Sequence, residues 1–431
     1  MRLFGTMTIE KNELVIGGVN ATTLAKEYGT PLYVMDEELI RENCRKYYNT
    51  FVGKNKKNRV TYAGKAFLNM AMCKILNEEG LYLDVVSGGE LYTAYKSGFP
   101  TEKIYFHGNN KTNFEINLGV ELGIGRFIVD NLHELEVLNE VAKNHEKVQK
   151  IYLRITPGIE AHTHEYIRTG QIDSKFGFPI IGNIILDIVQ KAIDLPYIEL
   201  SGLHCHIGSQ IFELEPFKDA VEIMINLIKD IYDKTSYLIP ELDLGGGFGI
   251  YYTETDKPKS AEEYCNTILN KVEDVCENVG IPKPILTIEP GRSIVGNTGT
   301  TLYTVGAIKE VPNIRKYVSV DGGMSDNIRP ALYKAQYECA LANRINDEEE
   351  EIVTVAGKCC ESGDVLLEKV SLPKVNSGDI LAIFSTGAYG YSMANHYNRI
   401  PKAAVVMVKN GNVRLVCKRE TYDDMLRNEY I

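Results

Sequence analysis

The chain has no tryptophan, no C-x-x-C pair among its nine cysteines, and no apolar run of the roughly eighteen residues that a membrane-spanning helix needs. It also has no basic excess. Its formal net charge is −11 and its pI is about 5.4, which argues against binding to nucleic acid or to an anionic membrane. The first residues, Met1–Gly5, lead into polar sequence rather than into the apolar core of a signal peptide. Since the cysteines are scattered and odd in number, as suits reduced thiols, these absences predict a cytoplasmic protein.

Strand-like and helix-like patterns alternate over most of the 431 residues, a length that exceeds one typical domain. Between residues 33 and 291 eight β-rich runs are separated by helical patterns, as in βα units around a parallel sheet. Eight such units in about 260 residues predict a TIM-type (β/α)₈ barrel. The eight runs are Val60–Ala63, Leu83–Val86, Ile104–His107, Arg126–Val129, Ile151–Ile155, Leu200–His206, Leu242–Leu244 and Ile285–Glu289.

After Arg292 the pattern changes to alternating strands with few helical segments, which is typical of an all-β domain. Residues 1–32 contain two further strand-like runs, Thr8–Glu10 and Glu13–Ile16. We therefore expect residues 1–32 and 292–431 to form one β-domain beside the barrel. Its later strands are expected at Thr301–Val305, Tyr317–Val320, Ile352–Ala356, Ile380–Phe384 and Ala403–Val408.

Unusual polar residues fall at the C-terminal ends of the barrel strands, where barrel enzymes place their reacting groups. These residues are Lys65, Ser87, His107, His206, Gly245–Gly247 and Glu289. Taken alone, Lys65 would be an exposed surface lysine. Its small or apolar neighbours Tyr62, Ala63 and Ala66 instead predict a partly desolvated, nucleophilic amine.

Glu289 ends the apolar run Ile285–Ile288, where an unpaired acid is unfavourable. It could pair with Arg292, or it could keep the ring nitrogen of a pyridine cofactor protonated, which makes that ring an electron sink. Gly291 and the glycines at 245–247 allow backbone N–H groups to approach a phosphate, and Ser209 adds a hydroxyl donor. A glycine triplet alone is more often a tight turn. Together with Lys65, however, these features favour pyridoxal 5'-phosphate (PLP).

Two H-x-H pairs keep a different class of enzyme open. His204 and His206 face one side of a strand, and His162 and His164 form a second pair, as ligands in a metal-dependent barrel hydrolase would. No later acid or cysteine has an accompanying ligand spacing, and a metal site does not explain two glycine-rich turns. We therefore expect no metal.

As a set, these motifs resemble the fold-type III PLP-dependent decarboxylases, over nearly the whole chain from Tyr33 to about Asn398. The resemblance implies that Lys65 carries the cofactor as a Schiff base. In the segment H-I-G-S-Q, His206 then stacks on the cofactor ring and Ser209 binds its phosphate. The remaining cofactor contacts that the resemblance implies are Gly246, Gly247, Glu289, Pro290, Gly291, Arg292 and Tyr389.

The segment Cys360–Asp364 matches the C-E-S-x-D motif of the same family. A cysteine beside an acid is by default a small buried residue, but a thiol can also protonate a carbanion. The resemblance implies a homodimer in which this segment completes the active site of the neighbouring subunit. Cys360 would then be the proton donor and Glu361 a substrate contact.

The segment Asp321–Tyr333, with its D-G-G-M sequence, bears on the substrate. Diamine-forming members place an acid near the distal amine of the substrate, whereas this segment resembles the branch that acts on diaminopimelate. Arg292 and Arg329 would bind a distal carboxylate through charge-assisted hydrogen bonds, with Tyr333 and Tyr389 as further substrate contacts. We therefore expect decarboxylation of meso-2,6-diaminopimelate to L-lysine and CO₂, the last step of lysine biosynthesis. Another amino-acid or carboxy-polyamine decarboxylase is the alternative.

Overall fold

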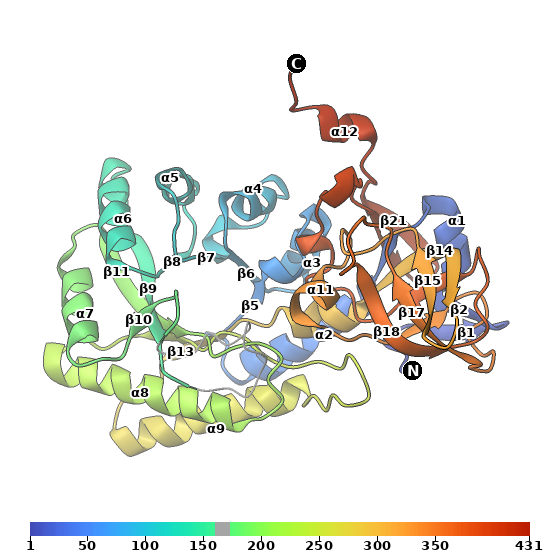
Figure 1. The fold of residues 1–431 in the computed structure, drawn as a ribbon. Coiled ribbons are helices and arrows are strands. Elements are labelled where there is room, and N and C mark those ends of the chain that lie inside the picture. Colours follow the sequence, from blue (N-terminus) through green and yellow to red (C-terminus); the bar gives the residue numbers. More distant parts are fainter. Residues whose placement is uncertain (160–172) are drawn as a thin grey trace. The chain divides into compact units, whose positions relative to one another are not determined.

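The computed structural model describes residues 1–159 and 173–431 (Figure 1). The pair His162 and His164 lies outside the described residues. The chain folds as two compact units. The barrel unit comprises Cys44–Gly249 and Pro258–Gly291, and the β-rich unit comprises Met1–Asn43, Ile250–Lys257 and Arg292–Ile431.

The barrel unit contains a closed ring of eight parallel strands, which confirms the predicted TIM-type barrel. The ring runs in the order β5-β6-β7-β8-β9-β11-β12-β13 and closes by pairing of β13 with β5. A short extra strand, β10 (Phe178–Pro179), pairs with β9. The ring strands are β5 (Arg59–Ala63), β6 (Tyr82–Val85), β7 (Ile104–Phe106), β8 (Arg126–Val129), β9 (Gln149–Thr156), β11 (Ile198–Cys205), β12 (Glu241–Asp243) and β13 (Ile285–Ile288).

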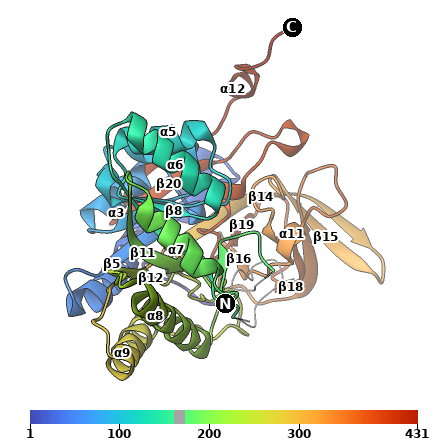
Figure 2. The same cartoon turned by 90° about the vertical axis from the view of Figure 1, so that its left-hand side faces the viewer.

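Helices lie outside this ring of strands (Figure 2). They are α3 (Met70–Glu78), α4 (Gly88–Lys96), α5 (Asn113–Leu122), α6 (Leu132–Asn144), α7 (Ile184–Asp194), α8 (Glu215–Thr235) and α9 (Ala261–Val279). Many begin at a side-chain cap; Asn131, for example, accepts a hydrogen bond from the Glu134 N–H at the start of α6. Among the described residues, no helix is long and apolar enough to cross a membrane.

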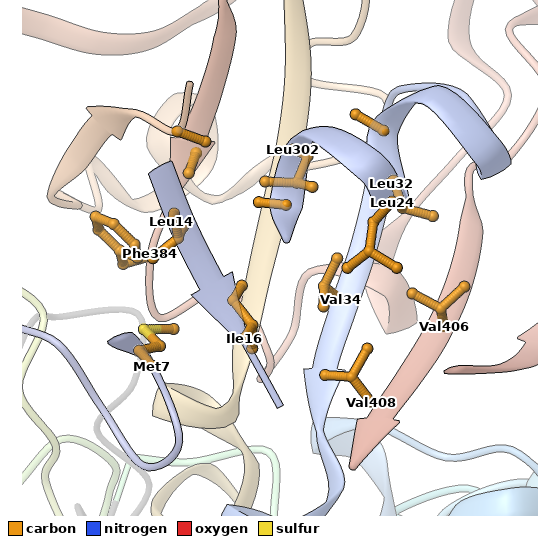
Figure 3. Packing of buried hydrophobic residues seen from close by; sticks show 14 of the residues in the cluster. Met7, Leu14, Ile16, Leu24, Leu32, Val34, Leu302, Phe384, Val406 and Val408 are labelled. Carbon is orange, nitrogen blue, oxygen red and sulfur yellow. The ribbon is translucent and has the colours of Figure 1, made fainter. Parts of the chain in front are cut away.

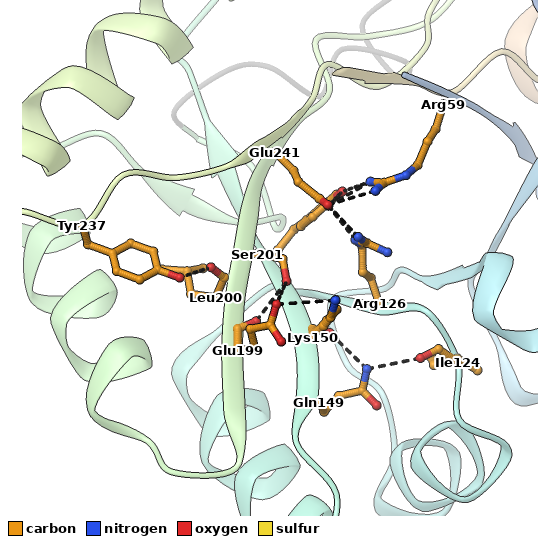
Figure 4. Close-up of polar contacts among 11 residues, drawn as sticks. Arg59, Ile124, Arg126, Gln149, Lys150, Glu199, Leu200, Ser201, Tyr237 and Glu241 are labelled. Carbon is orange, nitrogen blue, oxygen red and sulfur yellow. Dashed lines mark hydrogen bonds and ion pairs between the residues drawn. The ribbon is translucent and has the colours of Figure 1, made fainter. Parts of the chain in front are cut away.

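The N-terminal ends of the barrel strands are held by a buried ionic network (Figure 4). The first residue of β12, Glu241, accepts hydrogen bonds from Arg59 at 2.9 Å and from Arg126 at 2.8 Å, and these arginines begin β5 and β8. The hydroxyl of Tyr152 donates to the same carboxylate. Buried charges need partners, and each charge in this network has one. The network joins the starts of β5, β8 and β12 at the end of the barrel opposite to the glycine-rich turns.

The β-rich unit contains a large mixed sheet and a separate three-stranded sheet. The large sheet follows the order β18-β17-β15-β14-β4-β20-β21, and β19 pairs with β14 and β16. All the strands predicted for this part of the chain are present. Their bounds are β4 (Leu32–Asp36), β14 (Gly299–Val311), β15 (Arg315–Val320), β16 (Cys339–Leu341), β17 (Glu351–Ala356), β18 (Val365–Leu372), β19 (Ile380–Ile383), β20 (Ala404–Lys409) and β21 (Asn412–Cys417).

The N-terminal segment packs into the core of this β-rich unit. Its strands β1 (Thr8–Glu10), β2 (Glu13–Ile16) and β3 (Val19–Asn20) form the small sheet, followed by helix α1 (Ala21–Tyr28). Leu14 and Ile16 are fully buried in one apolar cluster that also contains Leu302 of β14 and Val406 of β20 (Figure 3). The burial of these apolar side chains joins segments from both ends of the chain. The remaining helices of this unit are α2 (Glu37–Tyr47), which continues into the barrel unit, and the short α10 (Arg292–Val295), α11 (Arg329–Tyr333) and α12 (Tyr422–Leu426).

Candidate active site

Lys65 lies in a single 3₁₀ turn, Gly64–Ala66, directly after β5. Gly64 packs so tightly against β6 that a Cβ there would lie 2.6 Å from the Asp84 carbonyl oxygen. The neighbouring residues Gly64, Ala66 and Phe67 are buried, but Lys65 itself is exposed. We expected these apolar neighbours to desolvate the Lys65 amine in part, and this expectation is wrong. The turn directs the neighbouring residues into the protein interior and the Lys65 side chain toward solvent.

Glu289, which follows β13, is buried between two histidines. His107 Nε2 lies 2.8 Å from Glu289 Oε1, and His204 Nε2 lies 3.2 Å from Glu289 Oε2. Burial raises the pKa of Glu289, but its interactions with the two imidazoles outweigh burial and hold this pKa well below its ordinary value. The arrangement keeps one buried carboxylate ionised.

Two further buried acids, Asp84 and Asp243, interact electrostatically with Glu289. Burial, followed by the negative charge of Glu289, raises the pKa of Asp84 and of Asp243 well above the usual range. Burial also lowers the pKa of His107 to about 3, so its imidazole is neutral at neutral pH and can still donate one N–H. In this cluster of groups the pKa of Glu289 is therefore lowered, whereas the pKa values of Asp84 and Asp243 are raised.

His206 lies close enough to Lys65 for the charge of the lysine to affect its pKa. Burial, followed by the positive charge of Lys65, lowers the pKa of His206 well below its ordinary value. His206 Nδ1 accepts a hydrogen bond from the Gly246 N–H at 3.3 Å, which leaves the proton of the neutral ring on Nε2. The structure thus brings Lys65, His206 and Glu289 together, as the sequence predicts.

The glycine-rich turn after β12 brings backbone groups close to neighbouring strand ends. Gly245 and Gly247 have φ values of 65° and 107°, which favour glycine. A Cβ at Gly246 would lie 2.1 Å from the Glu289 carbonyl oxygen, and one at Gly291 would lie 2.8 Å from the Ala63 Cβ. The Pro290 carbonyl accepts a hydrogen bond from the Ala63 N–H at 3.3 Å, and Ser209 is partly exposed three residues after His206.

These barrel residues fit PLP. An exposed lysine amine can bind the aldehyde, and a buried anionic carboxylate can accept a hydrogen bond from the protonated ring nitrogen. Glycine turns without Cβ atoms suit the phosphate.

In the β-rich unit, two arginines share one tyrosine hydroxyl. Arg292 Nη1 donates to Tyr252 Oη at 2.7 Å, and Arg329 Nη1 donates to the same oxygen at 3.2 Å. Arg329 also donates to the Tyr337 hydroxyl. Both arginines are only 7% exposed. The Tyr389 ring centroid lies 4.9 Å from the Arg292 guanidinium carbon, and Tyr389 has a φ of 61°, which is rare for a residue with a side chain.

The other predicted residues of this unit are at its surface. Tyr333 is partly exposed at the end of α11, and Cys360 and Glu361 are exposed in the loop between β17 and β18. Asp364 anchors this loop, because its buried carboxylate accepts hydrogen bonds from the N–H groups of Cys359, at 2.8 Å, and Met324, at 2.6 Å. The C-E-S-x-D segment and the D-G-G-M segment are thereby joined.

Comparison with known proteins identifies the family. Residues 37–296 match the family model "Pyridoxal-dependent decarboxylase, pyridoxal binding domain". The chain is 52% identical to the diaminopimelate decarboxylase of Bacillus subtilis (strain 168) over 99% of this chain and 98% of that protein. The chain belongs to the PLP-dependent decarboxylases. Within this family it is also 46% identical to the diaminopimelate decarboxylase of Staphylococcus aureus (strain COL), over 98% of this chain and 100% of that protein.

Solved structures of this family agree. The diaminopimelate decarboxylase of M. jannaschii, crystallised in complex with L-lysine, superposes with a TM-score of 0.92 at 37% identity, over 99% of this chain and 98% of that one. The lysine/ornithine decarboxylase of Vibrio vulnificus, in complex with cadaverine, has a TM-score of 0.75 at 22% identity, over 90% and 97% of the two chains. The latter likeness shows the fold alone. The protein is therefore a PLP-dependent decarboxylase with the two-unit architecture of this family.

Among the described residues, His107, His204 and Glu289 form one group whose ligand types and spacing would suit a metal ion. His107 Nε2 and His204 Nε2 lie 2.8 Å and 3.2 Å from the two oxygens of the Glu289 carboxylate. Because the chain belongs to the PLP-dependent decarboxylases, the metal-dependent hydrolase alternative is wrong.

Several residues of the site were not singled out from the sequence, or were assigned a different role. Asp84 was detectable in principle, because it is an acid within an apolar strand, whereas Tyr252 and Tyr337 are two of 26 tyrosines without a distinguishing pattern.

Ser87, expected near the reacting groups, is the N-cap of α4 and accepts from the Glu90 N–H at 3.2 Å. Glu134 does not complete a capping box with Asn131. Its carboxylate instead accepts from the Asp130 N–H and from the buried Lys111 ammonium, because that cation requires a partner.

Proposed function

We propose that this enzyme converts meso-2,6-diaminopimelate to L-lysine and CO₂, the last step of lysine biosynthesis. The observation that carries the proposal is the buried pair Arg292 and Arg329. Within the described residues, the recorded hydrogen bonds of Arg329 go to two phenol oxygens. A buried guanidinium favours an anionic partner, and the distal carboxylate of diaminopimelate supplies one. The full-length likeness to diaminopimelate decarboxylases supports the same substrate.

PLP, when bound, withdraws electrons from the substrate carbon that loses its carboxylate. Lys65 supplies the amine that holds the cofactor. Glu289, kept ionised by His107 and His204, accepts the hydrogen bond of a protonated ring nitrogen and so maintains the electron sink. His206, held by the Gly246 N–H, packs on the ring. Ser209, Gly246, Gly247, Pro290, Gly291, Arg292 and Tyr389 surround the rest of the cofactor in this proposal.

The proton that replaces the lost carboxylate comes from the Cys360 thiol of the partner subunit in a homodimer. The exposed loop that carries Cys360 and Glu361 supports this proposal, because Asp364 fixes its backbone while the two functional side chains remain accessible. Glu361, Tyr333 and Tyr389 contact the substrate.

The enzyme acts in the cytoplasm in this proposal. The nine cysteines support this location, because all nine are free thiols in the part of the chain that the structure describes.

Measurement of kcat/KM for meso-diaminopimelate and ornithine side by side tests this function. We expect L-lysine and CO₂ from diaminopimelate, and little or no putrescine from ornithine, whose distal ammonium would meet two guanidinium groups. Efficient turnover of ornithine would move the enzyme to the diamine-forming branch of the family.

A further inference from the structure

We propose that Tyr252 is a positioning residue that places the Arg292 and Arg329 guanidinium groups side by side for the distal carboxylate of the substrate. This inference rests on the proposed function and extends it to a residue that the motifs named above do not include. Tyr252 thereby helps the enzyme to select ligands that end in a carboxylate over ligands that end in an amine.

The position of one oxygen atom between two cations supports this role. Tyr252 Oη accepts from Arg292 at 2.7 Å and from Arg329 at 3.2 Å, and all three side chains are buried. Two guanidinium groups in a poorly solvated site repel each other unless an acceptor lies between them. The phenol oxygen provides that acceptor and sets the spacing of the two groups.

Tyr252 is itself held from two sides. Its ring packs edge-on against Tyr337, with centroids 5.4 Å apart and an interplanar angle of 85°. The Asp256 carboxylate accepts hydrogen bonds from the backbone N–H groups of Tyr252, at 2.9 Å, and Thr253, at 3.0 Å. Because both ring and backbone are fixed, the hydroxyl has a defined position, which a positioning group needs.

The electrostatics of the tyrosine agree with this geometry. Burial raises the pKa of Tyr252, but the charges of Arg292 and Arg329 and their hydrogen bonds outweigh burial and lower it below the ordinary value. This lowered pKa agrees with an oxygen that accepts hydrogen bonds from both guanidinium groups. A ligand whose distal end has an ammonium but no carboxylate would instead add an uncompensated third cation beside the two arginines, which is unfavourable.

The experiment compares the binding of L-lysine and cadaverine to the PLP-loaded enzyme by isothermal titration calorimetry. The two ligands differ only in the carboxylate that the arginines are proposed to bind. We expect Tyr252→Phe to weaken L-lysine binding about tenfold, as for the loss of one charge-assisted contact, and to leave cadaverine binding unchanged. With diaminopimelate, KM should rise by a similar factor while kcat changes little.

Two further variants complete the test. Tyr337→Phe removes a contact to Arg329 alone and should weaken L-lysine binding in the same direction but less. Tyr251→Phe is the matched control, since this adjacent tyrosine donates to Glu338 at 2.7 Å and is remote from both arginine contacts, and it should bind as the unmodified enzyme does. Each variant provides its own cadaverine reference, so a general loss of stability does not imitate the expected result.

The possible outcomes separate this proposal from the proposed function. If the unmodified enzyme prefers L-lysine over cadaverine and Tyr252→Phe retains the full preference, or weakens both ligands equally, the role of Tyr252 is refuted while the function stands. If the unmodified enzyme shows no preference and does not decarboxylate diaminopimelate, both proposals are refuted. A preference that Tyr252→Phe loses, with Tyr251→Phe unaffected, supports both.

Discussion

His107 Nε2 lies 2.8 Å from Glu289 Oε1 inside the barrel, and both side chains are buried. His204 contacts the other oxygen of the same carboxylate. Burial and the charge of Glu289 raise the pKa of the neighbouring Asp84 and Asp243, whereas the pKa of Glu289 is lowered, so Glu289 is the acid best suited to face a protonated ring nitrogen. The two imidazoles orient this carboxylate and resist its protonation.

Glu289→Gln tests this role. The amide retains the size of the side chain but removes its charge, so the cofactor should still bind while its ring nitrogen loses its proton. We expect kcat to fall by about a hundredfold or more, with the visible absorbance of the lysine-bound cofactor retained. Steady-state kinetics and an absorbance spectrum measure both effects. An unchanged kcat would reduce Glu289 to a structural partner of the histidines.

His107→Gln tests the effect of the buried imidazole on stability as a function of pH. The pKa of His107 is about 3 in the folded protein and about 6.5 when unfolded, so the unfolded state binds more protons between these values. His107 therefore costs the folded protein stability as the pH falls below about 6.5. Glutamine does not titrate. The deficit in unfolding free energy of the variant, relative to the unmodified protein, should thus shrink by about 2 kcal/mol between pH 7 and pH 5 in urea titrations. A constant deficit would show that His107 is not held neutral.

Arg329→Ala tests the distal carboxylate site. Loss of a charge-assisted contact worth roughly 1.5–3 kcal/mol should lower kcat/KM for diaminopimelate about ten- to two-hundredfold, with cofactor absorbance intact. Arg344→Ala is a suitable control, because this arginine pairs with Asp379 at 2.6 Å in the same unit. The control should leave kcat/KM near that of the unmodified enzyme. Equal losses in both variants would point to a general effect of removing arginine.

Mixing Lys65→Ala with Cys360→Ala protein tests whether the active sites are shared between subunits. Each variant alone should be inactive. After subunit exchange, half of the dimers are mixed, and each mixed dimer has one site with both residues intact, so about a quarter of the activity should return. If subunit exchange is demonstrated and no activity returns, both residues belong to the site of one chain.

The eight barrel strands could be predicted because each is a short β-rich run bounded by turn or helix signals. The exposure of the Lys65 side chain could not be predicted. Apolar neighbours in the sequence do not show whether a turn directs its central residue into the protein or toward solvent. Strand β4 was not predicted from the sequence, and it pairs with β14 and β20 of the β-rich unit. Such pairings between distant segments leave no local signal in the sequence.

His107 and His204 were also singled out from the sequence, but not as the residues that contact Glu289. The histidines that hold Glu289 come from β11 and from the residue after β7, and only the closed barrel brings them to β13. Tyr252 and Tyr337 likewise meet through folding of the β-rich unit. Residues that react follow family motifs, whereas residues that position them are defined by three-dimensional contacts.

The attachment of PLP to Lys65 is the central claim of this account, and identification of the modified peptide tests it most directly. The PLP-loaded enzyme is reduced with borohydride and digested, and the cofactor-bearing peptide is identified by mass spectrometry. The reduced cofactor should be found on the peptide that contains Lys65, and Lys65→Ala protein should give no such peptide. Recovery of the reduced cofactor on a peptide without Lys65 would contradict the account.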